Sequence, residues 1–129
     1  MKKIRVKILT PDGLYKTTEA SIVNVTSEDG QRGILPSHMP IVMILNIGKM
    51  ELEEEKREVY AVAGGMLYFK DDECTILCSA IENKDEIDLD RAIKAKERAL
   101  EHLGDPNSDL KRAEVALKRA INRIDIRSL

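Results

Sequence analysis

The chain has 129 residues, a formal net charge of −2 and a hydrophobic content of 43%, and aromatic residues make up only 3% of it. This length fits one domain, or one domain with an appendage, with a core of aliphatic side chains. The small net charge excludes a strong polyelectrolyte. The longest apolar run, residues 41–45, is far shorter than the roughly 20 residues that span a bilayer. We therefore expect a soluble chain that is not exported and that reaches a membrane only through a partner.

Short β-rich runs fill the first two thirds of the chain. Charged and apolar residues alternate at the N-terminus without a continuous apolar stretch, which predicts a strand and no signal peptide. The predicted strands are residues 3–9, 14–26 (continuous or broken), 32–35, 41–47, 49–54, 57–63, 66–70 and 74–80. Turns are predicted between them, including residues 46–48 and 64–65. This spacing indicates an antiparallel sandwich or barrel of about 80 residues. Residues 60–63 and 75–78 are apolar on both faces, which favours a sandwich.

Residues 33–40 read Gly-Ile-Leu-Pro-Ser-His-Met-Pro. Two prolines four apart exclude a helix, so the segment is predicted to be extended and rich in turns. Ser37 beside His38 suggests a nucleophile and its base. Adjacent residues seldom orient in that way, and no third orienting group is evident. We predict no catalytic site here.

Cys74 and Cys78 lie on one predicted strand, about 13 Å apart at the usual strand rise, which is too far for a disulfide. A zinc site needs more ligands, and His38 and His102 have no suggestive spacing relative to the cysteines. We predict two reduced thiols in the core and no metal site.

The hydrophobic period changes from 2 to 3.6 after residue 85. Asp88 is the predicted N-cap of a first helix that Gly104 ends. A five-residue loop, 104–108, leads to a second helix, so the pair forms an antiparallel hairpin. The predicted fold class is an all-β N-terminal sandwich, residues 1–85, followed by a C-terminal α-helical hairpin, residues 86–129, with α and β segregated. The helix seam is rich in alanine and buries little area, which suits either a fixed hairpin or one that opens and packs elsewhere.

The last 21 residues, 109–129, carry six basic and three acidic side chains. Arg112, Arg119 and Arg123 share a broad face of the second helix, and Arg91 and Arg98 on the first helix could converge with them. Guanidinium groups suit phosphate oxygens, so the arginines suggest an anionic ligand or partner. A solvated basic face is the alternative. The sequence has no glycine-rich phosphate loop, nucleophile elbow or His–Glu metal motif.

Five segments in order resemble the epsilon subunit of the bacterial F-type rotary ATP synthase. They are residues 9–13 (Leu-Thr-Pro-Asp-Gly), 33–40, 62–67 (Val-Ala-Gly-Gly-Met-Leu), 87–92 (Ile-Asp-Leu-Asp-Arg-Ala) and 112–120. The resemblance implies a non-catalytic rotor subunit of the central stalk of a proton- or sodium-translocating complex. Its implied partners are the gamma subunit, the c-subunit ring and, when the hairpin extends, the beta subunit and also the alpha subunit, with no nucleic acid. Its implied location is peripheral, at the cytoplasmic face of the cell membrane.

The resemblance also implies regulation. An extended hairpin would present its basic helix to an acidic segment of the beta subunit and resist rotation in the hydrolysis direction. Some family members bind ATP in the folded hairpin as a regulatory ligand, with no obligatory cofactor. In this chain the implied ATP-binding residues are three arginines for the phosphates, three residues beside the adenine and ribose, and the alanine that completes the matched Ile-Asp-x-x-Arg-Ala element. They are respectively Arg91, Arg119 and Arg123; Glu82, Ile87 and Asp88; and Ala92.

One segment departs from the family pattern. Residues 30–33 read Gly-Gln-Arg-Gly where the family often has Gly-Glu-Leu-Gly, so Gln31 and Arg32 are expected to change polar contacts with the ring. Two other functions remain open. One is a free-standing nucleotide-sensing module that uses the same arginines. The other is a nucleic-acid-binding protein with a basic helix, for which mixed charge and few aromatic residues are a poor footprint.

Overall fold

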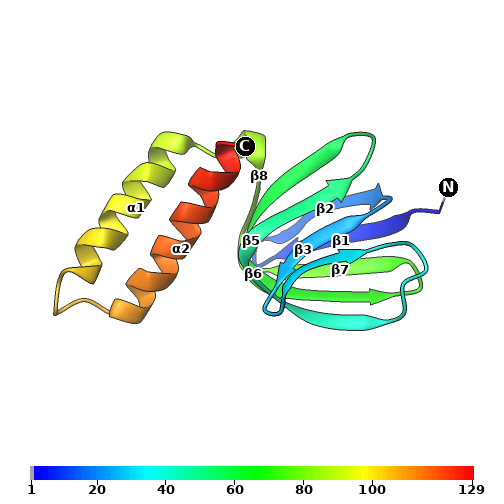
Figure 1. Ribbon diagram of the computed structural model, residues 1–129, viewed down its shortest axis with the longest axis horizontal. Coiled ribbons are helices and arrows are strands. Elements are labelled where there is room, and N and C mark those ends of the chain that lie inside the picture. Colours follow the sequence, from blue (N-terminus) through cyan, green and yellow to red (C-terminus); the bar gives the residue numbers. More distant parts are fainter. Residues whose placement is uncertain (1) are drawn as a thin grey trace.

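The computed structural model describes residues 2–129. Within them, one mixed sheet of eight strands forms a sandwich, and two helices lie beside one end of it (Figure 1). The strands are β1 (Ile4–Thr10), β2 (Gly13–Ala20), β3 (Val23–Ser27), β4 (Gly30–Ile34), β5 (Ile41–Glu53), β6 (Arg57–Lys70), β7 (Glu73–Cys78) and β8 (Ile81–Asn83). A short 3-10 turn, η1 (Lys84–Glu86), leads to α1 (Leu89–Leu103) and α2 (Leu110–Arg127). The predicted sandwich followed by a helical hairpin is confirmed.

The strands follow the order β2-β1-β7-β6-β5-β3-β4, and β8 pairs with β6. Every pairing is antiparallel except that of β1 with β7, which is parallel. The expectation of a purely antiparallel sandwich is therefore wrong at this pair. No hairpin joins β1 to β7, so the connection does not impose opposite directions on them.

Strands β5 and β6 are 13 and 14 residues long, and they run through the predicted turns at residues 46–48 and 64–65. Those turn predictions are wrong because the glycines serve close contacts within the sheet. A Cβ on Gly48 would lie 2.6 Å from the Thr26 Cβ, and one on Gly65 would lie 2.0 Å from the Leu77 carbonyl oxygen. Glycine inside a strand often marks such a close approach of another backbone or side chain.

Alternating side chains of the strands fill the interior of the sandwich. In β1, for example, Ile4, Val6 and Ile8 are fully buried while the residues between them are exposed. Cys74 and Cys78 are buried and unpaired, as predicted. Burial raises the pKa of the Cys74 thiol to about 12, so this thiol stays protonated and unreactive.

The proline-rich segment forms the predicted turn between β4 and β5. Ser37 has a φ of 69°, its N–H donates to the Asp72 Oδ1 at 2.5 Å, and its hydroxyl accepts from the Lys2 Nζ at 2.8 Å. The His38 ring lies edge-on to Phe69, with ring centres 5.9 Å apart. Ser37 contacts Asp72 and Lys2, whereas His38 contacts Phe69. These contacts hold the turn against the neighbouring strands.

Helix α2 packs on β5 and β6, and α1 packs on the outer side of α2 (Figure 1). Asp88 caps α1 as predicted, and Gly104 ends it. The buried residues of the seam are alanines, namely Ala92, Ala99, Ala113 and Ala120. The larger side chains of the predicted apolar stripes, such as Leu100 and Leu110, are each 49% exposed. Neither helix of residues 2–129 is long and apolar enough to cross a membrane.

Candidate functional site

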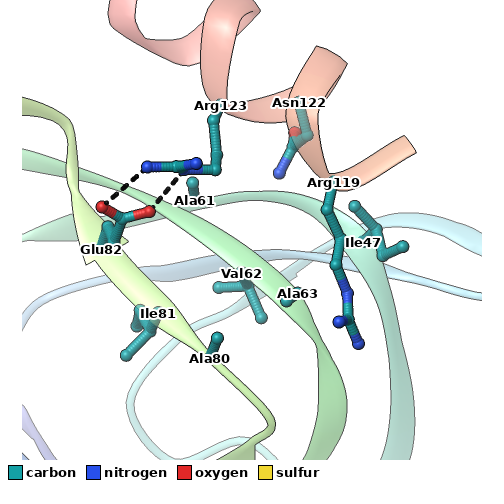
Figure 2. A pocket seen from close by; sticks show the side chains of 10 residues that line it. All are labelled: Ile47, Ala61, Val62, Ala63, Ala80, Ile81, Glu82, Arg119, Asn122 and Arg123. Atoms are coloured by element: carbon teal, nitrogen blue, oxygen red, sulfur yellow. Dashed lines mark hydrogen bonds and ion pairs between the residues drawn. The ribbon is translucent and has the colours of Figure 1, made fainter. Parts of the chain in front are cut away.

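A cavity of about 210 Å³ lies where α2 meets the sandwich (Figure 2). Its sandwich side is mostly apolar, and its α2 side is polar. The apolar residues are Ile47, Ala61, Val62, Ala63, Ala80 and Ile81, and the polar ones are Glu82, Arg119, Asn122 and Arg123. Positions 119, 122 and 123 fall on one face because residues three and four apart are neighbours on a helix. The helix thus presents two guanidinium groups and an amide to one apolar hollow.

An ion pair between Arg123 and Glu82 joins α2 to β8 at this cavity (Figure 2). The Arg123 Nε lies 2.6 Å from the Glu82 Oε1, and the Nη2 donates to the Oε2 at 3.3 Å. The arginine side chain is 22% exposed and the glutamate side chain 34%. The pair is therefore partly shielded from water, which strengthens it relative to a pair on the open surface.

The other polar residues of the cavity have different partners. The Asn122 Nδ2 donates to the Gly48 carbonyl oxygen at 3.1 Å, which fastens the middle of α2 to β5. The Arg119 side chain extends toward Ile47 and Ala63 (Figure 2). Within residues 2–129 it forms no ion pair with a carboxylate. Arg119 is thus a cation without a carboxylate partner in the described chain, and it lines the same cavity as the Arg123–Glu82 pair.

The seven residues of the implied ATP site fall into two groups in the structure. Glu82, Arg119 and Arg123 line the cavity. The other four lie where the chain enters and begins α1, and they are Ile87, Asp88, Arg91 and Ala92.

The second group has structural contacts of its own. Ile87 is buried against Ala61 and Ile126. The Asp88 Oδ1 accepts the Arg91 N–H at 3.1 Å, which is the N-cap of α1, and the Arg91 side chain is exposed. Ala92 is fully buried in the helix seam. The full ligand set stays a prediction.

The arginine rows of the two helices do not converge at one place. Arg98 and Arg112 face a separate hollow of about 570 Å³ between α1 and α2, near the loop that joins the helices. His102 lies there too, and its Nδ1 is 3.1 Å from the Ser108 hydroxyl. Arg119 and Arg123 belong to the cavity at the sandwich. Among residues 2–129, no three His, Cys, Asp or Glu side chains are grouped to hold a metal ion.

Sequence reasoning missed two polar groups of this region. Asn122 lies between Arg119 and Arg123, so a helical projection of α2 would have placed it on the same face. Tyr15 donates its hydroxyl to the Glu86 Oε1 at 2.6 Å and so ties β2 to the 3-10 turn. Burial, followed by the bond to Glu86, raises the pKa of this tyrosine. No local pattern announces a contact between residues so far apart in the chain.

Strands β5, β6 and β7 carry an exposed apolar surface, which on β5 and β6 lies away from the residues that contact α2. We call it the sandwich patch, and it consists of Val42, Ile44, Met66, Tyr68 and Leu77. Ile44 pairs with Met66, and Met66 pairs with Leu77, so these side chains form a row across three strands. Each of the five is between 46% and 55% exposed. An apolar surface shared by neighbouring strands is typical of an interaction site.

Both parts of the chain match known domains. Residues 3–84 match the family model of the ATP synthase delta/epsilon chain β-sandwich domain, and residues 85–127 match that of the long α-helix domain of the same chain. Fold and matches together define the class as a sandwich-and-hairpin subunit of the delta/epsilon type.

Similar sequences narrow this class. The ATP synthase epsilon chain of Bacillus pumilus is 45% identical over 128 residues, and that of Bacillus velezensis is 43% identical over 129 residues, with 98% of each chain covered in both comparisons. The chain belongs to the ATP synthase epsilon chain family. The resemblance found in the sequence is thereby confirmed.

Solved structures agree with the fold. A chain in the OSCP/F1/c-ring structure of the Euglena gracilis mitochondrial ATP synthase superposes with a TM-score of 0.81 at 24% identity, covering 93% of this chain and 78% of that one. A chain in the central stalk/c-ring structure of the Tetrahymena thermophila mitochondrial ATP synthase gives 0.63 at 14% identity, covering 98% and 95%.

Proposed function

We propose that the chain is a non-catalytic subunit of the central stalk, which couples the catalytic head of ATP synthase to the membrane ring. Its hairpin regulates ATP hydrolysis by leaving or rejoining the sandwich. Membership of the epsilon family supports this function, as does the likeness to chains in structures of the F1/c-ring and central stalk. In this role the chain is peripheral to the cell membrane, on its cytoplasmic face, and is held there by the complex.

The proposed regulatory role rests on one observation: the buried contacts of the hairpin are separate from the core of the sandwich. The core of the sandwich is one cluster, and the dock of the hairpin is another, made of Ala61, Ile87 and Ile126 with Val59 beside them. Asn122 and Arg123 add the polar contacts already described. A hairpin held by so few buried side chains can detach without opening the core, which is the behaviour of a switching element.

The surfaces suit the implied partners. The sandwich patch provides an apolar face for the gamma subunit. The exposed strand β4, which carries Arg32, faces the c-subunit ring. In the extended state, the basic residues of α2 meet the beta subunit, and the alpha subunit beside it.

ATP is the proposed ligand that favours the docked hairpin. Arg119 and Arg123 are placed to hold phosphate groups in the cavity. Pockets that enclose a whole small molecule usually exceed about 300 Å³, so this cavity would take only the phosphates. The adenine and ribose would then lie outside it, toward Ile87 and Asp88. A ligand that binds only the docked state stabilises it by RT ln(1 + [L]/Kd), so the ATP level would set the extended fraction.

Calorimetric titration of the chain with ATP tests the ligand. Heat of binding is expected for the wild type, with a large loss of affinity in Arg91→Ala and Arg123→Ala. No heat at millimolar ATP would remove ATP from the proposal.

Two experiments test the role in the complex. The chain is expected to co-purify with the gamma subunit. A chain that binds ATP and never associates with gamma would instead be a free-standing nucleotide sensor.

Deletion of residues 86–129 is expected to raise ATP hydrolysis by the reassembled enzyme, whereas unchanged activity would show that the hairpin does not inhibit hydrolysis.

A further inference from the structure

Glu82 contributes the only carboxylate that lines the cavity in the described chain, and it is paired with one of the two cavity arginines. The carboxylate contacts the side of the guanidinium that carries Nε and Nη2, at 2.6 and 3.3 Å. Arg119 reaches the same cavity without such a pair. In the described chain, the cavity is therefore lined by one guanidinium that is paired with a carboxylate and by one that is not.

A phosphate group would use the same donors of Arg123. Carboxylate and phosphate both present two oxygens to the fork of a guanidinium, so one edge of Arg123 cannot hold both in this geometry. We propose that Glu82 is a built-in competitor, which holds Arg123 when the cavity is empty and is displaced when a phosphate enters. This inference rests on the proposed function, because it concerns the same cavity and the same class of ligand.

The exchange gives Glu82 a different role in each state. Without a ligand, its carboxylate ties β8 to α2 and so keeps the hairpin docked. With a ligand, the phosphate becomes the anion that α2 holds, and Glu82 is released toward the adenine and ribose. The competition lowers affinity for phosphate, since the pair must break before a phosphate can use the Nε and Nη2 edge of Arg123. The cavity would therefore fill only when the concentration of the phosphate ligand is high.

The test compares ligands as well as variants. Inorganic tripolyphosphate carries the phosphates of ATP without adenine or ribose, so it reports on the arginines alone. Glu82→Gln keeps the size of the side chain and its hydrogen-bonding oxygen but removes the charge. Tripolyphosphate is expected to bind this variant about two- to fivefold more tightly than the wild type, the gain from releasing a partly exposed ion pair.

Two further variants sharpen the result. Glu28→Gln makes the same charge change in an exposed turn away from the cavity and is expected to leave binding unchanged. Glu82→Asp keeps the charge but shortens the reach to Arg123, and it is expected to bind tripolyphosphate more tightly than the wild type, by less than Glu82→Gln does. This second variant also serves if Glu82→Gln does not fold.

The outcomes separate the inference from the proposed function. If the wild type binds both ligands and the Glu82 variants bind tripolyphosphate no more tightly, Glu82 is not a competitor and the nucleotide site stands. If the wild type binds ATP but not tripolyphosphate, the phosphates do not use Arg123 and the inference is overturned. If it binds neither, the nucleotide site and the inference fall together.

Discussion

Two glycines show how differently the same residue is used. Gly65 lies against β7, where a Cβ would meet the Leu77 carbonyl oxygen at 2.0 Å. Gly104 caps α1 with a φ of −84°, and its nearest atoms would be an ordinary 3.6 Å from a Cβ. Gly65→Ala is expected to destabilise the chain by about 1–3 kcal/mol, because the strand must shift. Gly104→Ala is expected to stabilise it by about 0.4–1 kcal/mol through the unfolded state.

Urea unfolding of both variants and the wild type measures these changes. Equal midpoints for Gly65→Ala and the wild type would show that β6 and β7 do not need their close approach.

The buried thiol of Cys74 makes stability depend on alkaline pH. An unfolded thiol loses its proton near pH 8.5, whereas burial raises the pKa of this one to about 12. The unfolded state thus binds fewer protons across this range. The contribution of Cys74 to stability is complete below the unfolded pKa and declines as pH rises toward 12, by up to about 1.4 kcal/mol per pH unit.

Urea unfolding at about pH 8 and about pH 10 checks the dependence on Cys74. The decline in unfolding free energy is expected to be smaller in Cys74→Ala, which has no thiol there to titrate. The same decline in both proteins would assign it to other groups.

At the scale of the element, the hairpin is expected to open as a unit. Ile126 is 2% exposed and packs on Ile87 and Ala61, whereas Ile121 on the same helix is 38% exposed. Ile126→Ala is expected to lower the opening free energy of α1 and α2 by about 2–3 kcal/mol, with Ile121→Ala having a much smaller effect. Hydrogen exchange measures both. A matching increase in exchange of the core strands would mean that the hairpin and the sandwich unfold together.

The elements differ in how far sequence predicts them. Asp88 and Gly104 bound α1 through local chemistry, so both ends of the helix could be predicted. The parallel pairing of β1 with β7 could not, because it depends on how the whole sheet closes. Gly48 and Gly65 led to wrong turn predictions. The sequence does not show that a side chain or a backbone lies too close to these positions for any residue but glycine.

The candidate site divides in the same way. Arg119 and Arg123 are one turn apart, so their common face could be predicted from the period of the helix. Contacts across the chain could not. Arg123 meets Glu82, and Asn122 meets the Gly48 carbonyl, only because α2 docks on β5 and β8. The resemblance named Glu82 for the site, but not this pairing.

At the scale of the whole molecule, the sandwich patch is the surface available to a large partner. Met66 lies at the centre of its row and is 46% exposed. Met66→Glu is expected to change stability by no more than about 0.5 kcal/mol, since the side chain already meets water. It is expected to weaken association with the gamma subunit at least tenfold, because a charge would be buried at an apolar interface.

Pull-down of gamma with purified variants measures this loss. Leu110→Glu puts the same charge on a comparably exposed residue of the hairpin, which is 49% exposed, and is expected to retain gamma. Equal retention by both variants would move the gamma interface away from the patch.

Strands β5 and β6 connect the two working surfaces of the molecule. Each strand supplies side chains to the sandwich patch in one half, and in the other half it supports α2 through Gly48 or Ala61. At about 3.3 Å per residue, the path along a strand of this length is about 40 Å. A force on the patch would reach the hairpin dock along covalent backbone and paired hydrogen bonds. The sandwich residues that hold the hairpin would therefore turn together with the patch. The strain would fall on the few side chains between the hairpin and the sandwich, namely Ala61, Ile87 and Ile126.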